Sequence, residues 1–395
     1  MYGESFRLTG EYKANIFGSY GRRAMATSST IRAKIRPFTD SEETVRKANE
    51  SLPLFPPVPS HRDTEGQAPS PPDPAAGRVG IARLAASSPL AEAKRGAEYF
   101  LLPSRSILNR CDSDRVPFTW TVNPYRGCEF GCKYCYARYT HEYMDLDGGE
   151  FERKIFVKQD AGPLAARDLR FNPVRGEHIA IGTATDPYQP AEREFGATRA
   201  ILEEMAELEG LSLSITTKSD QVLRDLDLLK RINERSKISV NLSITTLRPG
   251  LARLLEPRAP RPDLRMGAVR TLRQNGIAAG VLAMPMLPGL TDRQADLEKL
   301  ARAASEAGAC WFAASVLFLM PASRKQFFPF LAEKFPRLSK QYEEWYARSG
   351  YAPESYRVEI TERFADLRRK YRLETRPEPP QRAVKQANEQ LTLAL

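Results

Sequence analysis

The residues best suited to chemistry in this 395-residue sequence are three cysteines in one short stretch. They lie in Asn123-Pro-Tyr-Arg-Gly-Cys128-Glu-Phe-Gly-Cys132-Lys-Tyr-Cys135-Tyr-Ala-Arg138, with the spacing C-x3-C-x2-C. A glycine-containing loop of this spacing can place three thiolates around one face of an iron–sulfur cubane and leave the fourth iron open. The spacing therefore predicts Cys128, Cys132 and Cys135 as ligands of a [4Fe-4S] cluster.

Zinc is the alternative metal for the same loop, with His141 as the fourth ligand. Structural zinc sites prefer two closely spaced cysteine pairs, or paired cysteines and histidines. The sequence contains no second closely spaced pair of cysteines, so the iron–sulfur cluster is the favoured prediction.

The total cysteine count bears on the cellular compartment. The chain has five cysteines, and Cys111 and Cys310 lie outside the loop. A secreted disulfide scaffold has an even set spread through a small chain, which differs from this pattern. The first residues lack a basic segment followed by an apolar one, and no apolar run approaches the roughly 18–20 residues of a membrane span. We therefore expect a cytoplasmic protein without a membrane partner.

The charge balance permits an anionic partner. Lys and Arg total 59 and Asp and Glu total 49, which gives a net charge of +10 at pH 7. Such a surplus is compatible with nucleic acid but does not identify it. Hydrophobic residues make up 42% of the chain, which is enough for a large core.

Composition divides the chain into four parts. Residues 51–80 are rich in proline and poor in large apolar side chains, so they cannot offset their chain entropy by burial. We expect a disordered extension over 1–90, a core barrel over 91–321, a helical extension over 322–374 and a polar tail over 375–395. Within the core, residues 150–158 are predicted to form an inserted hairpin.

The elements that must position the loop are apolar runs alternating with amphipathic stretches. The predicted strands are 118–122, 178–184, 211–217, 238–244, 278–284 and 311–319. The predicted helices are 191–209, 220–235, 262–275 and 292–307. Nearly continuous apolar runs are typical of strands covered on both faces, as in a parallel sheet with crossover helices. Six such repeats predict an α/β fold, a partial (β/α)6 barrel.

The cysteine loop, following directly on the first predicted strand, resembles the cluster-binding motif of the radical S-adenosylmethionine (radical SAM) superfamily. The longer stretch from Asn123 to Arg138 is similar to the spore photoproduct lyase-like branch, often described as DNA repair photolyase-like. The likeness spans residues 103–321. It implies a [4Fe-4S] cluster whose open iron binds S-adenosylmethionine. One electron then cleaves the cofactor to a 5′-deoxyadenosyl radical, which abstracts hydrogen from a substrate. It also implies an electron donor such as flavodoxin or ferredoxin.

Polar side chains follow successive predicted strands, where barrel enzymes carry their chemistry. The cofactor's amine, carboxylate and ribose hydroxyls need a carboxylate, a cation and hydroxyl groups, and Thr185, Asp186, Lys218 and Ser243 supply these types. By resemblance, the cofactor-contacting residues of the family fall on Thr185, Lys218 and Ser243. Thr185 and Asp186 also fit a helix N-cap or Asx turn. Lys218 also fits a solvated side chain, and Ser243 a small strand residue.

Two tyrosines, Tyr134 and Tyr136, flank Cys135. In spore photoproduct lyases, tyrosines at these positions are associated with hydrogen transfer, so both are candidate catalytic residues. Packing around the cluster is the alternative, because aromatic groups also exclude water from it.

Three charged residues, Arg253, Glu256 and Arg258, follow the fourth predicted strand. They either line the substrate mouth or form an exposed helical ion pair.

One residue departs from the family pattern. Spore photoproduct lyases carry a hydrogen-donating cysteine at the position aligned with Thr183. A hydroxyl O–H bond is too strong to return a hydrogen atom to a product radical. Cys310 begins the sixth predicted strand and is therefore expected at the opposite rim of the barrel. We do not expect repair of the spore photoproduct itself.

Three functions follow for comparison. The first is a radical SAM enzyme, lyase-like, that acts on nucleic acid, as in DNA repair. The second keeps this chemistry but acts on a peptide, an RNA base or a small metabolite. The third is a non-catalytic nucleic-acid-binding module with a structural zinc or iron–sulfur centre.

Overall fold

The computed structural model describes residues 74–94, 96–111, 113, 116–171, 174 and 176–377. Most of the predicted disordered extension and of the polar tail lies outside these residues. Within the described residues, regular structure is already present before the predicted core boundary, in helix α2 (Gly80–Ser87). None of the described helices combines the length and apolar character needed to traverse a bilayer.

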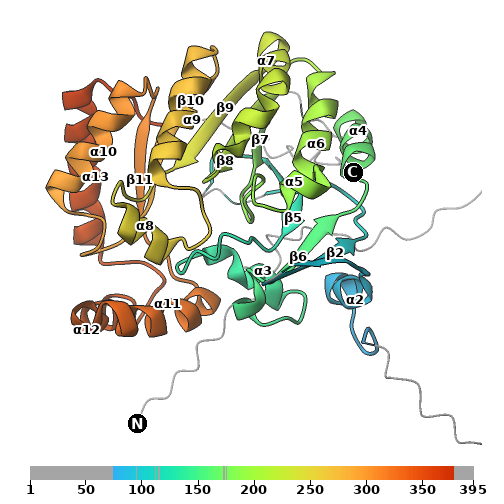
Figure 1. The fold of residues 1–395 in the computed structure, drawn as a ribbon, viewed down its shortest axis with the longest axis horizontal. Coiled ribbons are helices and arrows are strands. Elements are labelled where there is room, and N and C mark those ends of the chain that lie inside the picture. Colours follow the sequence, from blue (N-terminus) through green and yellow to red (C-terminus); the bar gives the residue numbers. More distant parts are fainter. Residues whose placement is uncertain are drawn as a thin grey trace, which may run out of the picture. The chain divides into compact units, whose positions relative to one another are not determined.

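A seven-stranded sheet forms the centre of the molecule, with the order β11-β10-β9-β8-β7-β4-β3 (Figure 1). Its strands are β3 (Leu108–Arg110), β4 (Trp120–Val122), β7 (His178–Ile181), β8 (Ser212–Thr217), β9 (Lys237–Ser243), β10 (Ala278–Met286) and β11 (Phe312–Val316). From β4 to β11 every neighbouring pair is parallel, and β3 runs antiparallel to β4 at the edge. Each of the six predicted strands is present, so the predicted partial (β/α)6 arrangement is confirmed.

Crossover helices cover the outer side of this sheet, as Figure 1 shows for α6, α7, α9 and α10. The helices that follow β6 along the chain, up to β11, are α4 (Ala161–Phe171), α5 (Glu192–Phe195), α6 (Ala197–Ala206), α7 (Leu226–Arg235), α8 (Pro249–Leu255), α9 (Pro262–Gln274) and α10 (Gln294–Glu306). Helix α8 lies beside the cysteine loop, where the carbonyl of Leu255 accepts from the amide of Lys133. The single helix predicted over 191–209 is divided into α5 and α6. The division falls at Gly196, whose φ of 58° is left-handed and ends α5. The helix predicted over 220–235 starts as a 3-10 turn, η3 (Asp220–Asp225).

A second, four-stranded sheet has the order β1-β2-β6-β5. Its strands are β1 (Leu90–Lys94), β2 (Ala97–Leu102), β5 (Tyr125–Arg126) and β6 (Lys154–Lys158). The hairpin predicted over 150–158 is therefore wrong. Its first residue ends a 3-10 turn, η2 (Gly148–Glu150), and β6 pairs with two strands distant in sequence, parallel to β2 and antiparallel to β5. This sheet matters for function because β5 leads directly into the cysteine loop.

The predicted helical extension is also present. It consists of α11 (Pro321–Lys334), α12 (Pro336–Trp345) and α13 (Glu354–Tyr371). Helix α13 packs on α10 and β11, whereas α11 packs on the segment after the cysteine loop, which forms η1 (Tyr136–Arg138) and α3 (Tyr139–Glu142). Figure 1 shows α11 and α12 away from the outer row of helices, beside α3.

Candidate functional site

The cysteine loop begins at a position that only glycine fits. Gly127 has φ +86°, and a Cβ there would lie 2.7 Å from the carbonyl oxygen of Lys154. The loop is then fixed by its backbone, because the amide of Cys128 donates to the carbonyl of Phe151 at 3.0 Å. The close β5–β6 pairing thus sets where the first cysteine begins.

The three thiols lie close enough to affect one another's ionisation. Burial raises the pKa of each, and the charges of Asp186, Cys132 and Cys135 raise the pKa of Cys128 further. A site of this kind disfavours free thiolates, so bound iron is what would hold them deprotonated. In a cubane each thiolate binds a different iron, so the sulfurs need not converge on one point. This donor set fits a [4Fe-4S] cluster at Cys128, Cys132 and Cys135.

The zinc alternative invoked His141. This ring is fully buried between Phe151 and Phe156, with centroid distances of 5.2 and 6.0 Å, and its Nε2 lies 2.9 Å from the carbonyl of Lys154. Within the described residues, no three His, Cys, Asp or Glu side chains converge on a point where they could bind one common metal ion, as zinc requires. His141 therefore has a packing role against the second sheet.

A buried arginine that the sequence analysis did not identify as a site residue binds the backbone of the loop. Arg138 is fully buried and donates to the carbonyl of Cys132 at 3.2 Å and to the carboxylate of Glu152 at 2.5 Å. From the other side, the hydroxyl of Ser323 in α11 donates to the carbonyl of Cys135 at 2.9 Å. The C-terminal extension thus helps to hold the loop in place.

The end of β7 joins the loop to β8. Thr185 donates its hydroxyl to the carbonyl of Gly127 at 2.6 Å. The Asp186 carboxylate accepts from the Thr217 hydroxyl at 2.6 Å, the Lys218 amide at 2.7 Å and the Tyr188 amide at 2.9 Å. The bond from the Tyr188 amide forms an Asx turn, which the sequence analysis gave as an alternative role for Asp186. Both predicted cofactor residues therefore position the loop and the adjoining strand end through their side chains.

A network around Glu256 joins the loop to the ends of β8 and β9. Glu256 is 2% exposed, so an exposed helical ion pair is wrong for this residue. Its carboxylate accepts from Arg265 at 2.6 Å, from the Thr245 hydroxyl at 3.0 Å and from the Tyr134 hydroxyl, and it lies 3.7 Å from Lys218 Nζ. Lys218 also stands 5.8 Å from the centre of the Tyr134 ring.

The charges in this network compensate one another. Burial would raise the pKa of Glu256, but Arg265 and Lys218 lower it to about 2, so the carboxylate is ionised at neutral pH. Arg265 also donates to the carbonyl of Ser243 at 3.0 Å, at the end of β9. Lys218 is 15% exposed at its side chain, so it lies next to the loop and is not freely solvated.

The neighbours of Glu256 in sequence lie elsewhere. Arg258 donates to the carbonyls of Gly96 and Glu152, at 3.5 and 3.4 Å, and so contacts the second sheet. Arg253 is exposed and donates to the carbonyl of Pro257 at 2.6 Å.

The two tyrosines that flank Cys135 differ in environment. Tyr134 is buried in the Glu256 network, whereas Tyr136 is 45% exposed and donates to the carbonyl of Thr183. The Thr183 hydroxyl accepts from the Asn123 side chain at 2.9 Å. Thr183 therefore lies next to the beginning and the end of the cysteine loop.

Cys310 lies away from this mouth, as predicted. Its amide donates to the carbonyl of Ala279, near the beginning of β10, at 2.8 Å. The residue is thus at the amino ends of the strands, opposite the cysteine loop.

Comparison with known proteins agrees with this geometry. Residues 122–302 match the radical SAM superfamily. The uncharacterized protein Rv2578c of Mycobacterium tuberculosis is 37% identical over 290 residues, which cover 72% of this chain and 85% of that protein. The uncharacterized protein MJ0683 of Methanocaldococcus jannaschii is 35% identical over 173 residues, 44% of this chain and 62% of that protein.

Solved structures of spore photoproduct lyase share the fold. A variant with dinucleoside spore photoproduct has a TM-score of 0.52 at 15% identity, covering 69% of this chain and 79% of that chain. Another variant, with bound AdoMet and the same dinucleoside, has a TM-score of 0.53 at 14% identity, covering 75% and 83%. From the family match and these relatives, this chain belongs to the radical SAM superfamily. That superfamily uses a [4Fe-4S] cluster and S-adenosylmethionine.

Proposed function

We propose that this protein is a radical SAM enzyme that acts on nucleic acid by a lyase-like reaction of the DNA repair type. The observation that carries the proposal is that Cys132 and Cys135 lie near Lys218 and Cys128 lies near Asp186, beside the carboxyl ends of the parallel strands. When bound, the cluster and S-adenosylmethionine supply a 5′-deoxyadenosyl radical that abstracts hydrogen from the substrate. The proposal includes a cytoplasmic location, where thiols stay reduced.

The residues of this chain have distinct roles in the proposal. Cys128, Cys132 and Cys135 hold the cluster. Lys218 and Ser243 face the cofactor from the ends of β8 and β9, and the lysine supplies the cation that a cofactor carboxylate needs. Thr185 and Asp186 position these groups through the bonds described above.

The two tyrosines are assigned different roles. Tyr134 is a positioning residue, because its hydroxyl is held by Glu256 and Thr245. Tyr136 is the proposed catalytic tyrosine, since its half-exposed ring lies at the mouth beside Thr183.

Two observations support nucleic acid as the substrate class. The chain carries a net charge of +10, and the solved lyases of the same fold hold a dinucleoside. Thr183 indicates a lesion other than the spore photoproduct, because its hydroxyl cannot return a hydrogen atom as a thiol does. Incubation with dinucleoside spore photoproduct should therefore give no repair.

The radical chemistry is tested by anaerobic reconstitution with iron and sulfide, followed by reduction in the presence of S-adenosylmethionine. The wild-type protein should form 5′-deoxyadenosine, and Cys128→Ala, Cys132→Ala and Cys135→Ala should each abolish it. Cys310→Ala is the matched control, because this thiol lies at the opposite end of the strands, and it should retain the product. Undiminished product from the three loop variants would sink the proposal.

The substrate class is tested by binding to duplex and single-stranded DNA over a salt series. Phosphate contacts make affinity fall steeply with salt. Weak binding that does not depend on salt would reject nucleic acid and favour a peptide, an RNA base presented alone or a small metabolite as the substrate.

A further inference from the structure

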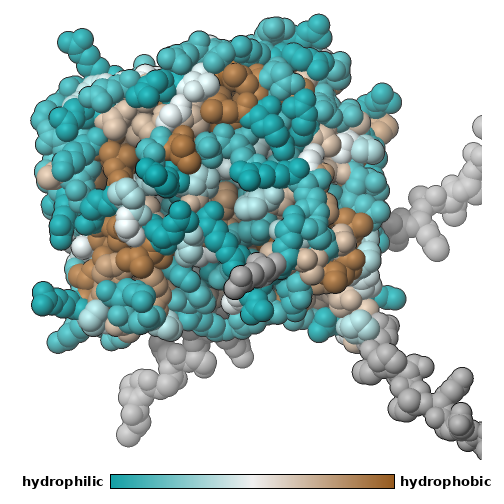
Figure 2. Space-filling model, viewed as in Figure 1, coloured by the Kyte–Doolittle hydropathy of each residue, from teal (hydrophilic) through white to brown (hydrophobic). Residues whose placement is uncertain are grey.

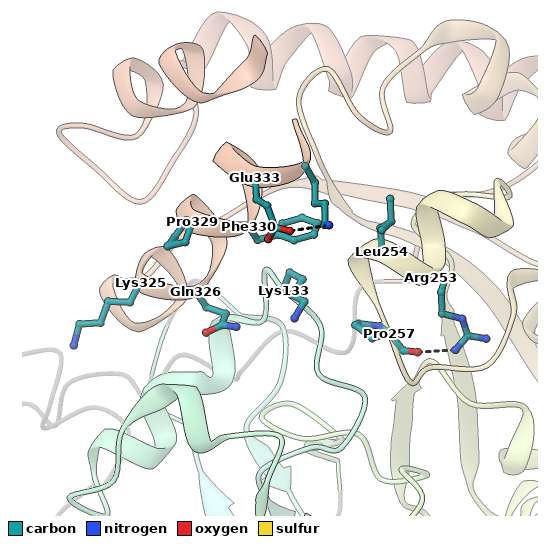
Figure 3. A pocket seen from close by; sticks show the side chains of 10 residues that line it. Lys133, Arg253, Leu254, Pro257, Lys325, Gln326, Pro329, Phe330 and Glu333 are labelled. Carbon is teal, nitrogen blue, oxygen red and sulfur yellow. Dashed lines mark hydrogen bonds and ion pairs between the residues drawn. The ribbon is translucent and has the colours of Figure 1, made fainter. Parts of the chain in front are cut away.

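The outer side of the cysteine loop carries a groove that the proposed chemistry does not use. Its volume is about 440 Å³, and it lies between α8, α11 and the loop (Figure 3). Figure 3 shows Lys133 pointing into the groove from the loop, with Lys325 on the α11 side and Arg253 on the α8 side. None of the predicted cofactor residues lines it.

The cysteine loop contributes Lys133 to the lining of the groove. Lys133 lies between Cys132 and Tyr134, and its amide donates to the carbonyl of Leu255 at the end of α8, at 2.9 Å. Phe330 of α11 lines the groove and also belongs to the apolar cluster that contains Cys128 and Cys132. A molecule seated in the groove would therefore be separated from the cluster only by the loop and its packing.

The groove has a surplus of positive charge. Lys133, Arg253, Lys325 and Lys334 line it, against one carboxylate, Glu333. Glu333 pairs with Lys334 at 2.7 Å, and both side chains are exposed. Lys325 is 71% exposed, and its carboxylate neighbour, Glu142, is 3.8 Å away. Exposed pairs of this kind are weak, so carboxylates of a partner can replace them at little cost.

Apolar side chains lie among these charges. Leu254 is 41% exposed, and Pro329 and Phe330 lie beside it in the lining. Figure 2 shows apolar side chains gathered near α8, in the lower left of the view, with hydrophilic side chains around them. An apolar centre with a charged rim is typical of a surface that binds protein. A phosphate backbone would gain little from the leucine, proline and phenylalanine.

We propose that this groove is the docking surface for an acidic one-electron carrier protein, of the flavin or iron–sulfur class, that reduces the cluster. The proposal rests on the proposed function. One electron passes from the reduced carrier to the [4Fe-4S]2+ cluster, which becomes [4Fe-4S]1+. The carrier is oxidised by that electron, and no bond forms or breaks. Complementary charge raises the rate of encounter and sets the orientation of the complex.

The test compares two triple variants of the reconstituted full chain. Arg253→Glu, Lys325→Glu and Lys334→Glu reverse the groove. Lys230→Glu, Arg235→Glu and Lys237→Glu reverse an equal charge of exposed residues at the opposite ends of the strands. The probe is an acidic bacterial flavodoxin, whose oxidised form is used for binding and whose reduced form is used for rapid-mixing reduction of the cluster. Lys133 is left intact because it is part of the cluster loop.

The groove variant should bind oxidised flavodoxin at least tenfold more weakly at low salt, and its cluster should be reduced by flavodoxin correspondingly more slowly. Reduction by dithionite should be unchanged, and the control variant should behave as wild type. Equal flavodoxin affinity in the groove variant and wild type would overturn the docking surface. So would a groove variant that loses DNA affinity but keeps flavodoxin affinity. Failure of the wild-type protein to take up iron and sulfide would instead overturn the proposed function, and the docking surface with it.

Discussion

Buried polar side chains at the two ends of the parallel strands are stabilised by different partners. At the carboxyl ends, Glu256, Arg265 and Lys218 are charged and compensate one another. Toward the amino ends, the His178 imidazole is held by neutral groups: it lies 2.8 Å from both the Ser212 and Ser214 hydroxyls. Buried charges are costly unless paired, whereas neutral hydrogen-bonded groups cost less. The buried charged network, which is the costlier arrangement, lies beside the cysteine loop.

A second uncharged contact lies between the starts of β10 and β11 and the inner part of β9. The indole nitrogen of Trp311 donates to the side-chain oxygen of Asn241 at 3.1 Å, and the side-chain nitrogen of Asn241 donates to the carbonyl of Ile215 at 3.2 Å. The indole lies against Gly280, where a Cβ would be 2.3 Å away. The stability of this contact depends on shape, whereas that of the Glu256 network depends on charge balance.

The largest expected effect is at the charged end. Glu256→Gln leaves Arg265 and Lys218 without their compensating charge, and breaking such a buried pair should lower the free energy of unfolding by about 3 kcal/mol. Asp263→Asn is the control, because the Arg261–Asp263 pair is exposed, and it should cost less than about 0.5 kcal/mol. Urea unfolding measures both. Equal stabilities for the two variants would mean that the charged network does not hold the site together.

The next effect is at the uncharged contact of Trp311. Gly280→Ala places a methyl group against the buried Trp311 indole, and overpacking of this kind should cost about 2 kcal/mol. Gly267→Ala in α9 is the matched control: its Cβ would meet nothing within 4 Å, and alanine favours the helix by about 0.5–1 kcal/mol. Thermal unfolding should thus move in opposite directions for the two variants. A shift in the same direction would contradict the packing described for Trp311.

The two tyrosines that flank Cys135 also differ in whether their hydroxyl contacts a charged group or an uncharged one. Tyr134→Phe removes a hydrogen bond to an ionised carboxylate, for which about 2 kcal/mol is expected, whereas Tyr136→Phe removes one to a carbonyl at the surface, for which about 0.5 kcal/mol is expected. Under the proposed function, only Tyr136→Phe should alter product formation more than it alters stability. Comparable losses of stability in the two variants would argue against a distinct environment for Tyr134.

A smaller effect than that of Tyr134→Phe is expected from the pH dependence of His178. Burial lowers the pKa of His178 to about 4, below the unfolded value of about 6.5. The unfolded chain therefore binds the proton first as the pH falls, and stability should decrease between pH 6.5 and pH 4, by about 1 kcal/mol for this partly exposed ring. His178→Gln should flatten that part of the stability profile. An unchanged profile would show that His178 is not held neutral in the folded protein.

The sequence predicts the six parallel strands well because their apolar runs, such as that of β10, are local and continuous. It also identifies the cysteines, since their spacing alone carries the chemistry. It fails for β6, whose partner β2 lies about fifty residues upstream, and for Gly196, whose left-handed backbone divides a predicted helix. These depend on tertiary pairing and on one backbone angle, which helical periodicity does not encode.

The candidate site shows the same limit. From the local sequence, Glu256 is a helix-end residue among arginines. Its burial depends on Arg265 from α9, Lys218 directly after β8 and Tyr134 from the loop. Arg138 similarly follows the cysteine motif as one more basic residue, and only the fold brings it to the carbonyl of Cys132. A charged residue close to a ligand motif is a weak signal until its partners from other strands are known.

Electron paramagnetic resonance of the reconstituted, reduced protein, recorded with and without S-adenosylmethionine, asks whether three cysteines leave one iron free to bind the cofactor. We expect about four iron and four sulfide per chain and a signal whose g values change when the cofactor is added. One zinc without iron, or a cluster signal that does not change when S-adenosylmethionine is added, would contradict a cluster with one iron open to the cofactor.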